Sequence, residues 1–376
     1  MKQAMKRPLS GIKVLDFSTL LPGPLCTLLL AEAGAEVIKI ERPGMGDELR
    51  TYQPRVGPDS LNFALLNRGK RSIAIDLKSQ GAVERLTPLI RAADVVVEQF
   101  RPGVMERLGL GYDALRALNP RIIYCAITGY GQDGPRAQVA AHDLNYVAES
   151  GMLSLAAGAD GAPVVPPALI ADIAGGAYPA VLNILLALRQ RDSDGAGSRL
   201  DISMSDNLFT FMYWALGEGE ATGKWPGPAT GLVAGGSPRY QVYRTADDRF
   251  VAAAPLEQRF WESFCAVIDL PAEFVDDKRD PQGTRRAIAA RIAAKTSAEW
   301  HKAFEGKDIC CVIMSSVEEA VRSEHFRARG LFAHKVETDT GPFTAVPVPV
   351  AEPFRDPRPT GYPRLGADND LLDTKD

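Results

Sequence analysis

The 376-residue sequence lacks an excess of basic residues: 43 lysines and arginines stand against 47 aspartates and glutamates, for a formal net charge of −4. Proteins whose main ligand is a nucleic-acid backbone carry clustered positive charge. The balance therefore argues against nucleic acid as the principal partner. Local basic clusters can still hold one phosphorylated ligand.

A secretory leader and a long apolar run are also missing from the pattern. The N-terminal MKQAMKRPLSG is positively charged, but Asp16 interrupts the apolar stretch behind it, and we find no run of 18 apolar residues. With 45% hydrophobic and 24% charged residues, the composition is ordinary for a globular protein. We expect a cytoplasmic protein with no membrane partner.

Cysteine and histidine are scarce. The five cysteines are odd in number and include no CxxC pair, and no histidine stands near them at zinc spacing. We expect reduced cysteines packed in the core, and no metal site. The chain has four histidines, His142, His301, His325 and His334, and the imidazole side chain can transfer protons near neutral pH.

The N-terminal part has the pattern of a parallel α/β sheet. Residues 11–17 and 35–41 are strand-like and flank a helical stretch, 27–33, which makes a βαβ unit. Further apolar runs that predict strands are 72–77, 94–100, 122–127 and 199–204. We therefore predict an α/β protein with a Rossmann-like parallel sheet in a large domain, although GxGxxG is absent after the first strand.

The rest of the chain predicts a second, smaller α+β domain. Residues 217–236 are rich in Gly, Pro and Thr and read as a linker. We assign residues 1–216 to the large domain, 237–330 to the small domain, and 331–376 to a C-terminal return along the large domain.

A histidine and an aspartate flank the central stretch of the chain. His142 follows the strand 122–127 and its glycine-rich turn, and Asp172 precedes a helix predicted over 173–189. A lone histidine is more often structural than catalytic, and an aspartate before a helix is commonly its N-cap. Both nevertheless lie on connections leaving one core, where α/β folds carry their chemistry. Burial can raise the pKa of Asp172, whereas a helix N-terminus would favour its ionised form.

Basic residues follow the ends of several predicted strands. Arg42 and Arg101 each come directly after a strand and before Pro-Gly, and Arg107 lies beyond Arg101. Solvated surface positions are the common place for arginine. At the carboxyl edge of a parallel sheet, however, an arginine fork suits a phosphate.

Over nearly its whole length the chain resembles the class III CoA-transferase superfamily, the CaiB/BaiF group. The resemblance rests on GIKVLDF, AEVIKIERPG, NRGKRSIAIDLK, FRPGVMERLGLGY, NPRIIYCAITGYGQDGP and the aspartate at position 172. It implies CoA thioester chemistry and an interlocked homodimer. It also implies that CoA enters as part of an acyl-CoA substrate, with no tightly bound cofactor.

Two branches of this superfamily fit. In its transferases one aspartate, matched by Asp172, attacks the thioester and forms an acyl-aspartyl anhydride. The α-methylacyl-CoA racemase branch adds a histidine, matched by His142, and a small-domain glutamate, matched by Glu257. We expect an epimerase of 2-methylacyl-CoA with catalytic His142, Asp172 and Glu257, and we keep the CoA transferase as the alternative.

The resemblance also implies the residues that contact CoA. For the nucleotide they are Arg42, Ile75, Asp76, Leu77, Lys78, Gln99, Phe100, Arg101 and Arg107. Beside the pantetheine and thioester they are Ala141, Asp143, Leu144, Asn145 and Tyr146.

Overall fold

The computed structural model describes residues 7–158 and 160–373. They form two compact units. The first is drawn from Met1–Ser150, Pro166–Phe211 and Glu324–Asp376, and the second from Gly151–Val165 and Met212–Ser323. The domain boundaries at 216, 236 and 330 remain predictions.

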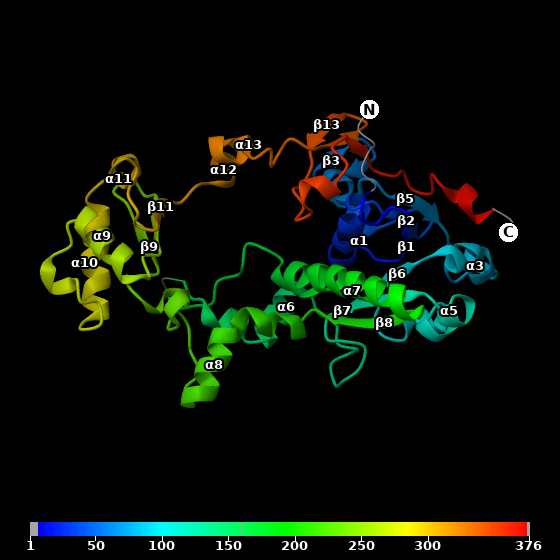
Figure 1. Ribbon diagram of the computed structural model, residues 1–376, viewed down its shortest axis with the longest axis horizontal. Coiled ribbons are helices and arrows are strands. Elements are labelled where there is room, and N and C mark those ends of the chain that lie inside the picture. The colour runs from blue at the N-terminus through cyan, green and yellow to red at the C-terminus, as the bar shows by residue number, and fades with distance from the viewer. Residues whose placement is uncertain (1–6, 159, 374–376) are drawn as a thin grey trace. The chain divides into compact units, whose positions relative to one another are not determined.

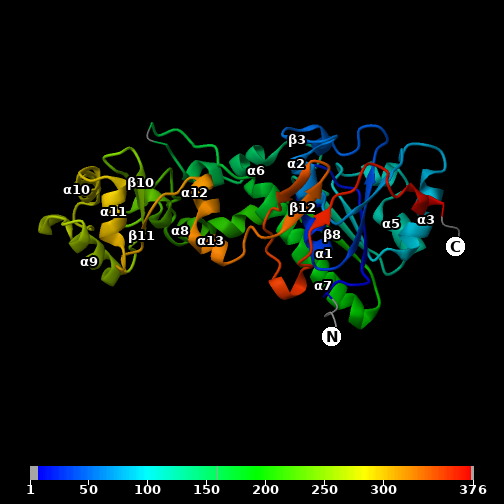
Figure 2. The ribbon, with the colours of Figure 1, turned by 90° about the horizontal axis from the view of Figure 1, so that it is seen from above.

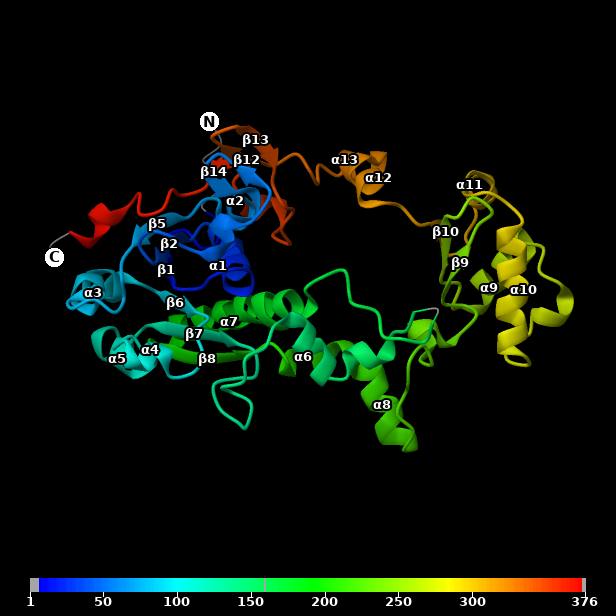
Figure 3. The ribbon, with the colours of Figure 1, turned by 180° about the vertical axis from the view of Figure 1, so that it is seen from behind.

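The first unit is built on a six-stranded sheet of order β5-β2-β1-β6-β7-β8, in which all neighbouring strands are parallel (Figure 3). Its strands are β1 (Lys13–Asp16), β2 (Glu36–Glu41), β5 (Arg71–Ala74), β6 (Val95–Glu98), β7 (Ile123–Thr128) and β8 (Ser198–Ser203). Along the chain this is the 3-2-1-4-5-6 order of a Rossmann-like sheet, which confirms the predicted fold class. The order reverses between β1 and β6, and ligands of such sheets bind at that reversal.

Helices cover both faces of this sheet, so its central strands β6 and β7 are buried at every residue. Leu15 of β1 and Val96 of β6 pack in one core cluster with Leu86 and Leu115, which come from helices on one face. On the other face α7 lies along β7 and β8 (Figure 1). The helices of the unit are α1 (Pro22–Glu32), α2 (Leu61–Asn67), α3 (Ala82–Ala92), α4 (Val104–Arg107), α5 (Tyr112–Leu118), α6 (Asp143–Glu149), α7 (Tyr178–Asp194) and α13 (Glu324–Ala328).

The C-terminal segment returns to the edge of the sheet. The Asp368 carboxylate accepts the Ser72 N–H at 2.9 Å, and the Asp368 N–H donates to the Ser72 carbonyl at 2.9 Å. The remaining strands of the unit form small sheets: β3 (Arg55–Val56) with β4 (Asp59–Ser60), and β12 (Lys335–Thr338) between β13 (Gly341–Thr344) and β14 (Thr360–Gly361).

The second unit is α+β. An antiparallel sheet of order β11-β10-β9 packs one face on helices around the buried Trp261, Phe264 and Trp300 (Figure 2). Its elements are α8 (Tyr213–Thr222), β9 (Gln241–Arg244), β10 (Phe250–Ala253), α9 (Gln258–Val267), α10 (Pro281–Ala293), α11 (Ser297–Phe304), β11 (Cys311–Ile313) and α12 (Val317–Arg322). Helix α8 extends into the predicted linker in spite of Gly217 and Gly219, and it ends where Gly223 adopts φ +69°.

The helical stretch Ala171–Asp194, which includes Asp172 and Pro179, contains an 18-residue window whose mean hydropathy would suit a membrane span. By length and composition alone this is weak evidence, because a helix packed on a sheet passes the same test, and 44% of the window is buried. Of the five cysteines, which are all free, Cys310 is exposed rather than in the core.

Candidate functional site

Two cavities lie where the strand order of the first unit reverses. The segment after β1 and the segment after β6 both contribute to each of them. The His142 cavity, of about 420 Å³, is lined by His142, Asp172 and Leu20, among others. The Arg42 cavity, of about 730 Å³, is lined by Arg42 and Lys78, among others. Phe100 lines both.

The structure brings most of the predicted residues to these cavities. Those that line the His142 cavity are Gln99, Phe100, Arg101, Ala141, His142, Asn145, Tyr146 and Asp172. Those that line the Arg42 cavity are Arg42, Ile75, Asp76, Leu77, Lys78, Phe100 and Arg107. Asp143 and Leu144 line neither of these two cavities.

His142 is held through its backbone at the start of α6. Its N–H donates to Asn145 Oδ1 at 3.0 Å, and the Asn145 N–H donates to the His142 carbonyl at 2.8 Å. The preceding residue is fixed by the Tyr146 hydroxyl, which donates to the Ala141 carbonyl at 2.9 Å. Tyr146 lies against Gly129, where a Cβ would come within 2.4 Å of the ring. The His142 side chain is exposed and lines the cavity.

Asp172 lies in the first turn of the helix Ala171–Ala177, which has wide, π-type hydrogen bonding and continues into α7. It is not the N-cap of this helix, which is Ile170. Burial, followed by the nearby charge of Asp143, raises the pKa of Asp172 from 3.8 to about 7. Desolvation therefore outweighs the effect that we expected from the helix N-terminus.

The carboxylate of Asp143 caps this helix from outside. Its Oδ1 accepts the Asp172 N–H at 2.9 Å, and the N–H groups of Ile170 and Ala171 also donate to it. Burial raises the pKa of Asp143 as well. Because Asp143 follows His142 in sequence, one buried carboxylate joins the two segments that bear His142 and Asp172. Sequence patterns did not predict this contact, because Asp143 and Asp172 are 29 positions apart.

Asp143 engages the N–H groups at the start of the Asp172 helix, so these groups are not free to donate to a ligand. The glycine-containing turn after β7 offers other backbone N–H groups, because Gly129 and Tyr130 line the His142 cavity.

Glu257 belongs to the second unit. It is exposed and is the residue before the first turn of α9, and its side chain does not cap that helix. The adjacent Gln258 is held by Arg239, whose guanidinium donates to Gln258 Oε1 at 3.1 Å. The role of Glu257 stays a prediction.

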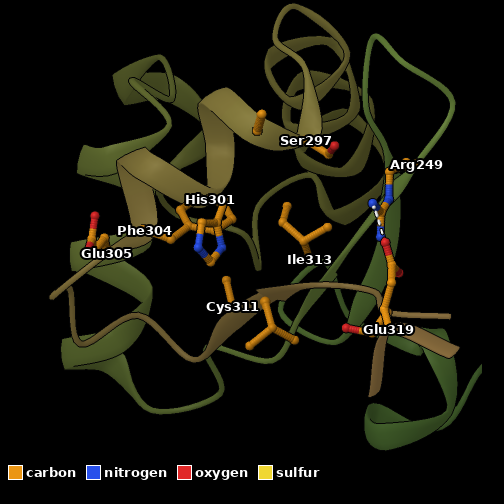
Figure 4. A pocket seen from close by; sticks show the side chains of 11 residues that line it. Arg249, Ser297, His301, Phe304, Glu305, Cys311, Ile313 and Glu319 are labelled. Atoms are coloured by element: carbon orange, nitrogen blue, oxygen red, sulfur yellow. Dashed lines mark hydrogen bonds and ion pairs between the residues drawn. The ribbon is translucent and has the colours of Figure 1, made fainter. Parts of the chain in front are cut away.

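The second unit has a cavity of its own, the Arg249 cavity, of about 630 Å³ (Figure 4). At one side the Arg249 guanidinium makes two bonds to the Glu319 carboxylate, at 2.9 and 2.8 Å, so the two charges satisfy each other. His301 projects into it from α11 near Cys311. Burial raises the pKa of the Cys311 thiol to about 12, which leaves it unreactive. None of the predicted site residues lines this cavity.

Comparison with known proteins agrees with the sequence motifs. A family model described as CoA-transferase family III matches residues 9–369. A human alpha-methylacyl-CoA racemase is 35% identical over 338 residues, covering 89% of this chain and 85% of that protein. An acetyl-CoA:oxalate CoA-transferase of Acetobacter aceti is 36% identical over 336 residues, covering 87% and 85%. A crystal structure of a CaiB/BaiF family protein from Brucella suis superposes with a TM-score of 0.82 at 26% identity, covering 98% and 99%.

Proposed function

We propose, from the premise that this chain belongs to CoA-transferase family III, that it is a racemase which inverts the α-carbon of a 2-methylacyl-CoA. The observation that carries the proposal is that His142 and Asp172 line one cavity at the reversal of the sheet. Inversion next to a thioester needs one group that removes a proton and a second that returns one on the opposite face. A histidine and a buried carboxyl group can fill these two roles.

The reaction proceeds through an enolate. One of the two groups takes the α-proton, and the electron pair of the C–H bond moves to the thioester oxygen. The other group then gives a proton to the α-carbon from the opposite face as the electron pair returns. Which group acts first depends on the enantiomer, so each must serve both as acid and as base.

The pKa of Asp172 suits this double role. A carboxyl group with a pKa of about 7 is divided between its protonated and ionised forms at neutral pH. Proton transfer is most effective when the pKa of the catalytic group lies near the working pH. An ordinary aspartate would be ionised almost completely and would be a poor acid.

The Arg42 cavity is the proposed place of the CoA nucleotide. Arg42, Lys78 and Arg107 bring three cationic groups to its wall, beside the carboxylates of Glu41, Asp47, Glu48 and Asp76, and its apolar lining includes Ile75 and Leu77. Arginine forks and lysine ammonium groups bind phosphates through charge-assisted hydrogen bonds. The pantetheine would then pass Phe100, which lines both cavities, and bring the thioester to His142.

The second candidate is a CoA transferase that uses Asp172 as a nucleophile. Its support is that an oxalate CoA-transferase and a racemase have similar identity to this chain. In that reaction the Asp172 carboxylate attacks the thioester carbonyl, the CoA thiolate leaves, and an acyl-aspartyl anhydride remains. A second carboxylic acid would then be needed to take up CoA.

Incubation of one substrate in D₂O separates the two. A racemase exchanges the α-proton of (S)-2-methylacyl-CoA for deuterium and lowers its optical purity with no other acid present, which mass spectrometry and chiral analysis detect. Exchange that is absent, together with turnover only after a carboxylic acid is added, would contradict the racemase proposal. Hydroxylamine would then trap the modified Asp172.

Further parts of the proposal concern the assembly. We propose a homodimer, as the family resemblance implies, in a cytoplasmic setting. Glu257 would orient the imidazole of His142, either in its own chain or in the partner. The acyl-CoA is the proposed small-molecule partner, and coenzyme A is bound as part of it.

A further inference from the structure

The segment after β1 forms part of the wall of both cavities. Phe17 and Thr19 line the Arg42 cavity, whereas Leu20 and Pro22 line the His142 cavity. A shift in the backbone of Thr19 or Leu20 would therefore change the two cavities relative to each other. In the sequence this segment is marked by its position after a predicted strand and by Leu21-Pro22-Gly23-Pro24 in place of GxGxxG.

Leu20 has an unusual backbone conformation. Its φ is +62°, in the left-handed region that residues with a Cβ rarely adopt. Such a conformation persists only where the surroundings impose it, and it is often found at functional sites. One hydrogen bond restrains the Leu20 backbone: its N–H donates to Asp47 Oδ1 at 3.1 Å.

Asp47 is itself anchored by a buried lysine. Lys39 Nζ lies 2.9 Å from Asp47 Oδ2, and both side chains are fully buried. The same ammonium group donates to the Ser18 carbonyl at 2.7 Å. Lys39 and Asp47 therefore hydrogen-bond to the segment after β1 at two residues, Ser18 and Leu20. Asp16 makes a third hydrogen bond to this segment, because its side chain accepts the Ser18 N–H at 3.0 Å.

A buried ion pair of this kind is weak evidence for a stabilising role. Removing two charges from water costs several kcal/mol, and a protein with apolar residues of similar volume in place of the pair is often equally stable. Here both partners direct hydrogen bonds at the backbone of one cavity-lining segment. Their placement therefore favours a role in fixing that segment.

We propose that the buried Lys39–Asp47 pair holds Leu20 in its left-handed conformation as a positioning device for the reaction. This arrangement of Lys39, Asp47 and Leu20, here called the clamp, fixes the position of the His142 cavity wall relative to the Arg42 cavity. When the nucleotide of an acyl-CoA is bound in the Arg42 cavity, its thioester then lies beside His142 and Asp172. Lys39, Asp47 and Leu20 are positioning residues. The inference rests on the proposed binding of an acyl-CoA across the two cavities.

The comparison of Leu20→Ala with Leu20→Gly tests the backbone restraint. Both variants lose the leucine side chain, but only glycine adopts positive φ without strain and leaves the segment free to move. We expect Leu20→Gly to melt no lower than Leu20→Ala, yet to have a kcat at least about tenfold lower, with KM changed less than about threefold. Equal kcat values for the two variants would overturn the proposal.

Asp269 provides the matched control. It also has positive φ, at +53°, and lies in the second unit between α9 and α10. Asp269→Ala and Asp269→Gly should differ in melting temperature in the same direction as the Leu20 pair, while their kcat values agree. A kcat difference of similar size between the two Asp269 variants would mean that glycine at any positive-φ residue lowers kcat. That result would contradict the proposed positioning role of Leu20.

Two variants of Asp47 examine the other end of the clamp. Asp47→Asn keeps a carbonyl oxygen that can accept the Leu20 N–H, whereas Asp47→Ala removes the acceptor. We expect Asp47→Asn to retain at least about tenfold more kcat than Asp47→Ala at similar KM. Comparable losses in kcat would contradict a role through Leu20.

The test does not depend on which reaction the protein performs. All variants are compared on the reaction of the wild-type chain, either α-proton exchange or CoA transfer to an added acid. A wild-type chain that transfers CoA without α-exchange would overturn the racemase proposal and still allow the Leu20 comparison to succeed or fail by itself.

Discussion

At the scale of single residues, two effects compete at Asp172. A carboxylate in the first turn of a helix gains from the helix dipole, typically by less than about 1 kcal/mol. Burial and the neighbouring charge of Asp143 act in the opposite direction and raise its pKa to about 7. Since each pKa unit corresponds to about 1.4 kcal/mol, the larger effect is desolvation. The proposed catalytic group therefore lowers the stability of the fold that holds it.

This conflict predicts that Asp172→Asn stabilises the protein above neutral pH. Between pH 3.8 and about 7 the folded wild-type chain binds more protons at this site than the unfolded chain does, so its contribution to stability falls as pH rises. Asparagine does not titrate. We expect the variant to exceed the wild type by up to ~4 kcal/mol in the free energy of unfolding at pH 8, and by far less at pH 4.

Urea denaturation of both chains at the two pH values measures this difference. Because other titrating groups are common to both chains, their contributions cancel. A gain of equal size at pH 4 and pH 8 would show that the pKa of Asp172 is not raised on folding.

His142 leads to a second prediction at this scale. His142→Ala should lower α-proton exchange by at least about 100-fold, because one of the two proton-transferring groups is gone. The imidazole is exposed, so the fold should remain intact. His301→Ala, which removes an exposed imidazole from the second unit, is the matched control and should exchange at the wild-type rate in the same deuterium assay. Exchange that survives in His142→Ala would rule out the two-group mechanism.

At the scale of elements, the helix that carries Asp172 depends on close backbone contact. A Cβ on Gly175 would lie 2.3 Å from the Met204 carbonyl oxygen, just beyond the end of β8. Glycine at position 175 leaves room for this close approach. The position of Asp172 is therefore set by a contact one turn away from it.

Gly175→Ala should disturb both stability and activity. Overpacking against a backbone oxygen forces the helix away from β8, at a typical cost of about 1–3 kcal/mol. We expect a lower melting temperature and slower exchange. The control is Gly217→Ala, in α8, where a Cβ would meet no atom within 4 Å and helix propensity should raise stability by up to about 1 kcal/mol. Thermal denaturation that ranks the two variants in the opposite order would contradict this account.

The elements also show how far the sequence could lead. Apolar runs and short connections predicted the parallel sheet, because strands buried on both faces, such as Val95–Glu98, appear in the sequence as continuous apolar runs. Position after a strand predicted that Arg42, Arg101 and His142 would lie at one edge of the sheet. The contact of Asp143 with the Asp172 helix and the φ of Leu20 were missed, because they depend on tertiary contacts of residues 29 and 27 positions apart.

At the scale of the whole molecule, each unit has its own core, and the proposed chemistry draws on both. The first unit carries the two cavities, while Glu257 stands exposed on the second. Exposed apolar side chains indicate where further chain would be buried. On α7 the outward residues Tyr178, Leu182, Leu185 and Leu186 recur at helical spacing, and both Leu182 and Leu186 are 58% exposed.

This stripe on α7 is the proposed contact of the homodimer. Contiguous apolar surface of this kind commonly marks a protein interface. Leu182→Asp combined with Leu186→Asp should convert a dimer to a monomer, because each leucine that is buried on association contributes about 1.5–3 kcal/mol and each aspartate would have to be desolvated.

Size-exclusion chromatography with light scattering measures the mass of both chains. Val317→Asp is the control, since Val317 is 82% exposed on α12 of the second unit and its replacement should leave the mass unchanged. A wild-type chain of 40.6 kDa in solution, or a double variant that keeps the dimer mass, would exclude the stripe as the interface. If the dimer is lost and exchange falls with it, while His142 and Asp172 are intact, the active site needs a second chain, which is the expected result if Glu257 acts across the interface.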